Sequence, residues 1–421
     1  MTGHIAIAGA SMGGLRAAEQ LRAAGWTGEI TVLGDEPHMP YNRPPLSKEA
    51  LAGEASFASL AFTPRASTAD VTWRLNTTVT GARLTERAIE LDGGERLGYD
   101  GLVVATGTRP RRLRCAGPSG PGSGRHTVRT LDDAHGLRAE LTRPGARVVV
   151  IGAGFIGCEV AATAIGLGVT EVTVVDPEPL PMLRPLGTPL ARELLRRHEL
   201  RGVRFALGRG VTAFGGGERI SGVVLADGSV LAADVVVEAV GSTPATAWLE
   251  GNGLDLSDGV LTDALLRVRA YGEAVPEVVA VGDAARFPNA RYASHDAVAR
   301  RVEHWSIPGD TAKRAAKSLV AALTGADPDP APFAPLPTFW SDQHDFRLQS
   351  FGAPGLGTAD IRILDGELTG DVVVGYHTAD GELTGVVALG GRSAVARAAR
   401  YRAQLLRRPA PTDPTPTPAT V

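Results

Sequence analysis

Short apolar runs alternate with helical patterns in two parts of the chain. Residues 4–9 and 147–152 read HIAIAG and RVVVIG, which predicts buried strands. The segments that follow, LRAAEQLRAAG and EVAATAIGLG, carry small residues on one side and predict helices packed against a sheet. A further apolar run follows each helix, EITVL and EVTVV. This repeated order of strand, turn, helix and strand predicts an α/β fold with two parallel sheets.

Each first strand ends in a glycine-rich turn, GASMGG at 9–14 and GAGFIG at 152–157. Such a turn presents N–H groups and the positive end of a helix to a pyrophosphate. The first glycine of each motif, Gly9 or Gly152, would make the tight turn. The small residue at the third position, Ser11 or Gly154, would let the backbone approach the phosphates, and the last glycine, Gly14 or Gly157, would let the helix pack closely on the strand. The second strands end near acids, Asp35 and Glu36 in one unit and Asp176 in the other, placed to accept hydrogen bonds from ribose hydroxyls. Incidental glycines are the alternative, but two such turns predict two dinucleotides and electron transfer between them.

Further buried strands that end in turns of small residues follow, and the composition changes near residue 325. Buried strands end in small-residue turns at 105–107 and 240–241, and EVVAVGDAARF runs into Gly282 and Asp283. An acid at the carboxyl end of a strand lies where α/β folds bind ligands. Beyond residue 325 a proline-rich linker leads to alternating segments that predict a small sheet domain. The tail PAPTDPTPTPATV at 409–421 is predicted to be disordered.

Composition narrows the classes of function only moderately. The chain has 421 residues, 43% of them hydrophobic, and a net charge of −3, which gives no reason to expect nucleic acid as a partner. Cys115 and Cys158 form no CxxC or metal-binding pattern and suit a reducing compartment. No apolar run has the length of a membrane span, and the first strand begins without a signal peptide. We therefore predict a cytoplasmic protein without a metal or membrane partner.

Seven segments carry a resemblance that covers nearly the whole chain. They are PYNRPPLSK at 40–48, ATGTRPR at 105–111, RTLDDA at 129–134, VVVIGAGFIGCEVA at 148–161, AVGDAARF at 280–287, VEHW at 302–305 and PTFWSDQHDFRLQSFG at 337–352. In these the chain resembles the FAD-containing, NADH-linked ferredoxin reductases of bacterial oxygenase systems, the putidaredoxin reductase-like family. FWSDQ is the most specific segment, because general disulfide reductases lack it.

The resemblance implies two Rossmann-type domains of the glutathione reductase kind and a small C-terminal α+β domain. The FAD domain would comprise residues 1–111 and 240–325, the inserted NAD domain 112–239 and the C-terminal sheet domain 326–408. Implied FAD contacts are Gly9, Ser11, Gly14, Asp35, Arg43, Pro45, Lys48, Val79, Ala105, Thr106, Gly107, Arg129, Gly282, Asp283 and Trp305. Implied NADH contacts are Gly152, Gly154, Ile156, Gly157, Glu159, Asp176 and Gly241.

Two of these residues would take part in catalysis. Lys48 would lie beside the isoalloxazine, where a cation stabilises the negative charge of the reduced ring. Glu159 would pair with this lysine and orient the nicotinamide, although a carboxylate in a first helical turn also suits the helix dipole. Trp305 would lie against the flavin, with core packing as its alternative. The family usually continues after VEHW with another sequence, and Pro308 and Gly309 here predict a changed loop before the next helix.

The missing cysteine argues against a disulfide as the electron acceptor. Related enzymes that reduce disulfides need a redox cysteine near the flavin, and the segment DEPHMPYNRPPLSK contains none. The resemblance therefore implies delivery of electrons to an acidic iron-sulfur ferredoxin that feeds an oxygenase. A monodehydroascorbate or nitrite-system reductase, and an interaction module similar to apoptosis-inducing factor, remain open. Basic residues at 109–114 and around VEHW, Arg300 and Arg301 among them, are predicted to steer the acidic partner.

Overall fold

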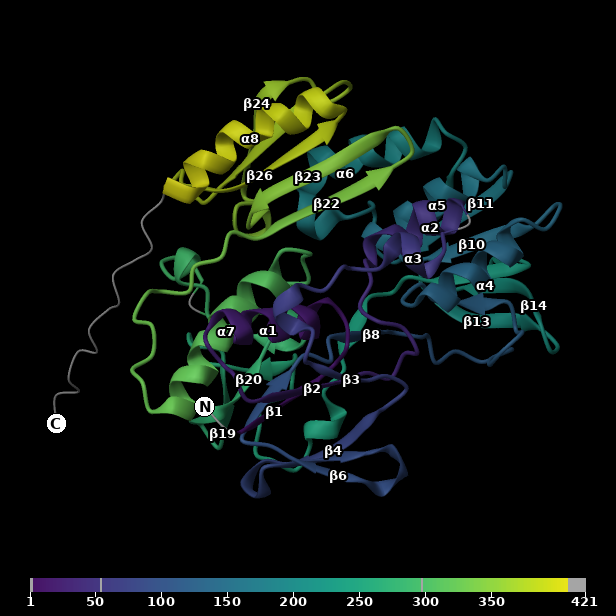
Figure 1. Ribbon diagram of the computed structural model, residues 1–421. Coiled ribbons are helices and arrows are strands. Elements are labelled where there is room, and N and C mark those ends of the chain that lie inside the picture. The colour runs from purple at the N-terminus through teal and green to yellow at the C-terminus, as the bar shows by residue number, and fades with distance from the viewer. Residues whose placement is uncertain (1–2, 54, 297, 408–421) are drawn as a thin grey trace, which may run out of the picture.

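The computed structural model describes residues 3–53, 55–296 and 298–407, and shows three sheet-based units around a common centre (Figure 1). The predicted disordered tail at 409–421 lies outside the described residues. No helix in the described ranges is long and apolar enough to cross a membrane. The two parallel sheets predicted from the apolar runs are both present, which confirms the α/β fold class.

The first unit is built on a six-stranded sheet with strands from distant parts of the chain. Its order is β19-β20-β7-β1-β2-β3, parallel except for the β19–β20 pair. The strands are β1 (His4–Ala8), β2 (Glu29–Leu33), β3 (Thr72–Arg74), β7 (Gly101–Val104), β19 (Arg267–Ala270) and β20 (Glu273–Ala280). Helices α1 (Met12–Ala23) and α7 (Ile307–Thr324) pack against each other beside it. Short strands complete the unit: β4 (Val79–Arg83), β5 (Ala88–Leu91), β6 (Arg96–Gly98), β18 (Val260–Leu261) and β21 (Ala285–Arg286). The short helices α2 (Glu49–Ala52) and α3 (Phe57–Leu60) come from the same part of the chain, but α2 packs against helices of the second unit, with Leu51 in that unit's core.

The second unit is a five-stranded parallel sheet in the order β12-β11-β10-β16-β9. Its strands are β9 (Arg125–His126), β10 (Arg147–Ile151), β11 (Glu171–Asp176), β12 (Arg204–Leu207) and β16 (Val235–Glu238). Its helices are α4 (Leu131–Leu141), α5 (Phe155–Gly166) and α6 (Leu183–Glu199), and a small sheet is made by β13 (Val211–Gly216), β14 (Ile220–Leu225) and β15 (Val230–Ala232). Val148, Val150, Val235 and Val237 are fully or almost fully buried in its core.

The chain passes between these units through an antiparallel pair of short strands. β8 (Thr108–Pro110) leads out of the first unit and pairs with β17 (Ser242–Pro244), which leads back. Both crossings therefore lie side by side, next to the small-residue turns at 105–107 and 241. The arrangement agrees with an inserted second unit, and the predicted boundaries at residues 111, 239 and 325 stay predictions.

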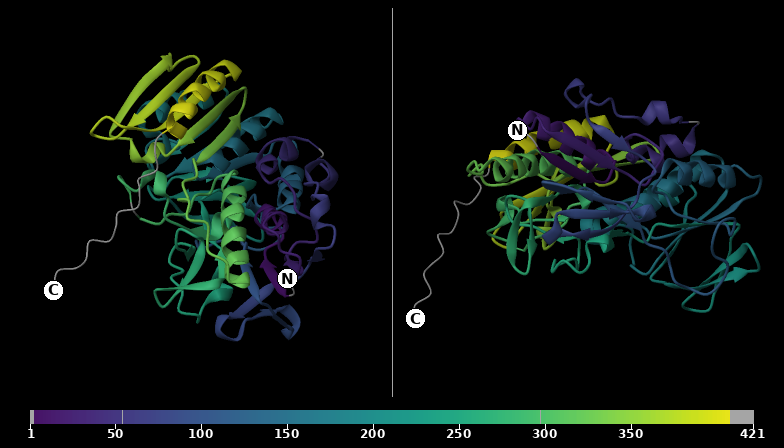
Figure 2. Two further views of the ribbon diagram at one scale, coloured as in Figure 1. Left: turned by 60° about the vertical axis from the view of Figure 1, so that its left-hand side comes forward. Right: turned by 60° about the horizontal axis from the view of Figure 1, so that its bottom comes forward.

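The third unit is an antiparallel sheet that lies against the second unit (Figures 1 and 2). Its order is β22-β23-β26-β25-β24, with β22 (Thr338–Gln343), β23 (Phe346–Gly352), β24 (Asp360–Gly366), β25 (Val372–His377), β26 (Leu383–Gly390) and the helix α8 (Arg392–Arg407). One face packs on α8 through Ala394 and Ala398. The other packs on α6 through one apolar cluster that contains Leu186 and Leu190 from α6 and Tyr376 from β25. The contact fixes the third unit to the second.

Candidate functional site

A single cavity of about 1060 Å³ joins all three units. It is lined by residues of both glycine turns, by the loop at 41–48, and by Phe339 and Trp340 of the third unit. The predicted site residues that line it are Gly9, Ser11, Asp35, Arg43, Lys48, Val79, Ala105, Thr106, Gly107, Arg129, Gly154, Ile156, Glu159, Gly241, Gly282, Asp283 and Trp305. Residues scattered over nearly 300 positions of the chain thus meet in one space.

Five predicted site residues do not line the cavity: Gly14, Pro45, Gly152, Gly157 and Asp176. Two of these glycines, Gly14 and Gly157, lie behind the cavity lining, where close backbone contacts leave no room for a side chain. A Cβ on Gly14 would lie 2.0 Å from the carbonyl oxygen of Gly9, and one on Gly157 would lie 1.9 Å from that of Gly152. The cavity wall at the proline pair is formed by Pro44 rather than Pro45.

In the first glycine turn, two backbone segments lie so close together that only glycine fits. Gly9 has a φ of +119°, and a Cβ there would lie 2.3 Å from the carbonyl oxygen of Ala105. Ser11 begins α1 as its N-cap and makes no capping bond with its own side chain. Its hydroxyl instead accepts a hydrogen bond from Arg43 Nε at 3.3 Å. The N-terminus of α1 therefore remains directed at the cavity, where it favours an anion.

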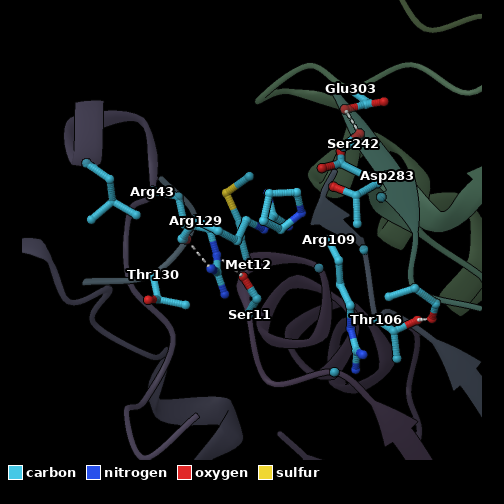
Figure 3. Close-up of a pocket in the computed structure, with 18 of the residues that line it drawn as sticks. Ser11, Met12, Arg43, Thr106, Arg109, Arg129, Thr130, Ser242, Asp283 and Glu303 are labelled. Carbon is cyan, nitrogen blue, oxygen red and sulfur yellow. Dashed lines mark hydrogen bonds between the residues drawn. The ribbon is translucent and has the colours of Figure 1, made fainter. Parts of the chain in front are cut away.

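Arg129 and Asp283 are ionisable side chains on opposite sides of the cavity (Figure 3). Among the described residues neither side chain has a hydrogen-bond partner. Burial lowers the pKa of the Arg129 guanidinium and raises the pKa of the Asp283 carboxyl to about 6. Such groups lack compensation within the protein and suit a ligand with phosphates and hydroxyls. These residues therefore fit a bound dinucleotide.

Glu36 organises the loop at 41–48, a role that the sequence did not indicate. It accepts hydrogen bonds from Arg43 Nη2 at 2.5 Å and from the Tyr41 hydroxyl at 2.6 Å. Arg43 also donates to the carbonyl oxygen of Arg129 at 2.6 Å. Asp35, predicted for the adenosine ribose, lies at the cavity with its side chain 60% exposed and 3.9 Å from Arg109. The two adjacent acids have different positions: one supports the loop, and the other is available to a ligand.

Lys48 and Glu159, which both line the cavity, form an ion pair. Lys48 Nζ lies 2.9 Å from Glu159 Oε2, and the side chains are only 12% and 4% exposed. Lys48 follows the turn Pro44–Ser47, and Glu159 lies in the first half of α5. The sequence predicted this pair through the family resemblance alone, and the structure brings the two groups together from different units.

Two serines that were not predicted complete the surroundings of Glu159. The Ser47 hydroxyl donates to Glu159 Oε2 at 2.5 Å, and the Ser341 hydroxyl donates to Oε1 at 2.6 Å. Ser341 belongs to the FWSDQ segment on β22, so the motif was visible in the sequence although its contact was not. Glu159 belongs to the second unit and is thus bonded by side chains of the first and third units.

Trp305 lies at the mouth of the cavity and not in the core. It is 41% exposed, its indole N–H donates to Asn42 Oδ1 at 3.1 Å, and its ring centre is 5.7 Å from that of Trp340. The changed loop predicted at Pro308 and Gly309 is wrong, because α7 already begins at Ile307. Pro308 occupies its first turn, where a missing N–H costs nothing.

The second glycine turn resembles the first in shape. Gly152 has a φ of +104°, and a Cβ there would lie 2.3 Å from the carbonyl oxygen of Ala239. Asp176 ends β11 beside this turn and accepts hydrogen bonds from the backbone N–H groups of Ala153 at 2.6 Å and Glu178 at 2.8 Å. Each carboxylate oxygen keeps a further lone pair for a ribose hydroxyl.

Neither cysteine lies in the cavity. Cys158 is fully buried, its Sγ is 3.6 Å from the carbonyl oxygen of Ala153, and burial raises its thiol pKa. Cys115 Sγ lies 3.7 Å from the carbonyl oxygen of Val211 in the second unit. Thiols placed in this way are poor candidates for redox chemistry.

The basic residues around VEHW are largely neutralised within the protein. Arg301 is paired with Asp258 at 2.7 Å and Glu303 at 2.9 Å, with a side chain only 10% exposed. Arg300 is paired with Asp296. The predicted steering role of this cluster therefore has little support, whereas Arg111, Arg112 and Arg114 remain exposed.

Comparisons with known proteins show the family to which the chain belongs. Residues 3–307 match the family described as pyridine nucleotide-disulphide oxidoreductase. The ferredoxin–NAD(+) reductase component of the biphenyl dioxygenase system of Paraburkholderia xenovorans is 35% identical over 86% of this chain and 84% of its own. Putidaredoxin reductase of Pseudomonas putida is 35% identical over 83% of this chain and 80% of its own.

A solved structure extends the likeness to the whole fold. The covalent complex of putidaredoxin reductase with putidaredoxin matches with a TM-score of 0.86 and 30% identity, over 97% of this chain and 94% of that one. The family implies a flavin and NAD(H) as cofactors, and the cavity residues fit both. The chain belongs to the pyridine nucleotide-disulphide oxidoreductases and, among them, to the ferredoxin reductases of oxygenase systems.

Proposed function

We propose that this protein is an FAD-dependent NADH–ferredoxin reductase, which passes electrons from NADH to an iron-sulfur ferredoxin that feeds an oxygenase. The observation that carries the proposal is the cavity itself. Its lining includes residues of both glycine turns and the buried pair Lys48–Glu159. Relatives named as reductases of dioxygenase systems support the choice of acceptor. The cytoplasmic location stays a prediction of the sequence.

The residues have distinct roles in this proposal. Backbone N–H groups of both turns and the Arg129 guanidinium would hold pyrophosphate, and Asp283 would hold the hydroxyls of the flavin side chain. Lys48 would place its charge beside the flavin ring, and Glu159 would orient Lys48 and the nicotinamide. Bound flavin takes up two electrons as hydride and gives them up singly, which a nicotinamide does not do. The protein supplies proximity and orientation.

The flavin is expected to be FAD, bound without a covalent link. The first glycine turn and Asp35 extend the site past the flavin phosphate to a second nucleotide half, which FMN lacks. Heat or acid denaturation should release a yellow compound that runs with FAD in chromatography, in about one equivalent per chain. Release of FMN, or flavin that stays with the precipitated protein, would contradict this assignment.

The proposed activity is tested by stopped-flow mixing of the NADH-reduced protein with ferredoxins encoded in the same organism. We expect at least one ferredoxin to be reduced many times per second, within the usual range of enzymes. Ferricyanide, a small acceptor without a docking surface, serves as the control for a competent flavin. Rapid reduction of ferricyanide without reduction of any ferredoxin would favour another acceptor. A long-lived complex with NAD and slow turnover would favour an interaction module.

A further inference from the structure

A buried row of polar side chains leads away from Glu159 into the third unit. Ser341 donates to Glu159, Gln343 Nε2 lies 2.8 Å from Ser341 Oγ, and Gln343 Oε1 lies 2.7 Å from His198 Nε2. His198 Nδ1 in turn lies 3.2 Å from His344 Nε2. Ser341, Gln343 and His198 are 0%, 1% and 0% exposed. The row begins on α5, crosses to β22 and reaches α6.

The chemistry of the groups fixes the direction of every hydrogen bond in the row. The Glu159 carboxylate is paired with Lys48 and can only accept, so Ser341 must donate its one hydrogen to it. Ser341 Oγ can then only accept, so Gln343 must present its NH₂ group to it. Gln343 therefore presents its oxygen to His198, and His198 Nε2 must carry hydrogen.

The hydrogen bond between His198 and His344 has the same direction as the others. Burial lowers the pKa of His198 to about 4, so the ring is neutral at physiological pH. A neutral ring with hydrogen on Nε2 has an acceptor at Nδ1, and His344 Nε2 lies there. Each group thus donates toward Glu159, and aligned donors of this kind strengthen one another in a medium of low polarity.

We propose that Ser341, Gln343 and His198 are positioning residues that fix the Glu159 carboxylate for hydride transfer. Gln343 directs the single hydroxyl hydrogen of Ser341 to Glu159 Oε1, and His198 fixes the orientation of the Gln343 amide. Ser47 and Lys48 fix the other oxygen, so the carboxylate cannot rotate. The inference rests on the proposed role of Glu159. In this proposal the FWSDQ segment both lines the cavity, through Phe339 and Trp340, and orients the carboxylate that positions the nicotinamide.

The first test compares two buried serines of the same sheet. Ser341→Ala removes the donor to Glu159. Ser350→Ala, on the neighbouring strand β23, removes a hydroxyl that is also 0% exposed and has no partner among the described residues. In anaerobic stopped-flow at saturating NADH, we expect Ser341→Ala to slow flavin reduction about tenfold, as for loss of one hydrogen bond to a charged group. Ser350→Ala should match the wild type, and equal rates in the two variants would overturn the proposal.

The second test reverses the direction of the hydrogen bond between Ser341 and residue 343 with a side chain of nearly the same size. In Gln343→Glu the carboxylate has no N–H, so it accepts the Ser341 hydrogen and takes it away from Glu159. We expect flavin reduction to slow by about tenfold, with the KM for NADH changed by less than about threefold, because the pyrophosphate contacts are untouched. A variant that reduces its flavin at the wild-type rate would show that Gln343 only fills space.

A third measurement does not depend on activity. Nitrogen-15 NMR of histidine-labelled protein distinguishes the two ring nitrogens, and His198 is expected to carry its hydrogen on Nε2. A hydrogen on Nδ1 alone would contradict the direction of the row. Glu159→Gln distinguishes the role of Glu159 from its positioning by Ser341. A normal rate of flavin reduction in this variant would refute the role of Glu159 itself. Slow reduction in Glu159→Gln together with a normal rate in Ser341→Ala would refute only the positioning.

Discussion

Lys48→Met is expected to slow the reduction of bound flavin by NADH about a hundredfold, the usual cost of losing one group that stabilises developing charge. Lys48 lines the cavity, and its side chain is only 12% exposed. Methionine has a similar length and no charge. Stopped-flow absorbance of the flavin at saturating NADH measures the effect. Lys313→Met, an exposed lysine on α7, is the matched control.

The same substitution leaves Glu159 buried without its counter-ion. Breaking a buried pair from one side costs roughly 3 kcal/mol, here reduced by the hydrogen bonds from Ser47 and Ser341. The double variant Lys48→Met, Glu159→Gln should therefore recover most of the lost thermal stability but not the rate. A fast double variant would show that Lys48 acts only by balancing the charge of Glu159.

The wild-type protein is expected to prefer NADH to NADPH by about a hundredfold in kcat/KM, roughly 2.7 kcal/mol. Asp176 lies beside the second glycine turn, where its charge would repel a 2′-phosphate. The nearby Arg184 does not offset this repulsion, because it is paired with Glu178 at 2.5 Å. Steady-state kinetics with both nucleotides checks the preference.

Asp176→Asn tests the residue responsible. Asparagine removes the charge and keeps one oxygen that can accept from the Ala153 N–H, while the hydrogen bond from the Glu178 N–H is lost. We expect the preference for NADH to fall about tenfold in this variant, since repulsion is lost and no phosphate ligand is gained. Glu171→Gln, at the exposed beginning of the same strand, is the matched control. An unchanged preference in Asp176→Asn would assign the discrimination to another residue.

The sequence predicted those parts of the site that depend on local pattern. The strands before Gly9 and Gly152, and the turns themselves, follow from apolar runs and from glycines that must adopt positive φ. The loop predicted at Pro308 is wrong for a local reason, because proline is equally suited to the first turn of a helix, and α7 begins at Ile307.

Other parts depend on segments that meet only in the folded chain. Ser341 reaches Glu159 across 182 positions, and no periodicity in either segment indicates the contact. The ion pair of Arg301 with Asp258 cannot be predicted from the sequence pattern, because the two residues are 43 positions apart. Long-range hydrogen bonds and ion pairs of this kind require the topology before they can be assigned.

The six-stranded sheet also sets an order of assembly during synthesis. Its strand β7 pairs with β20, in the register Val103 with Val279, so the first unit cannot complete its sheet until residue 280 has left the ribosome. All strands of the second sheet lie between Arg125 and Glu238 and are available earlier. The unit that begins second is therefore the first that can close its core. Meanwhile the edge of β7 stays unpaired, which is the interval in which a nascent chain is most exposed to aggregation.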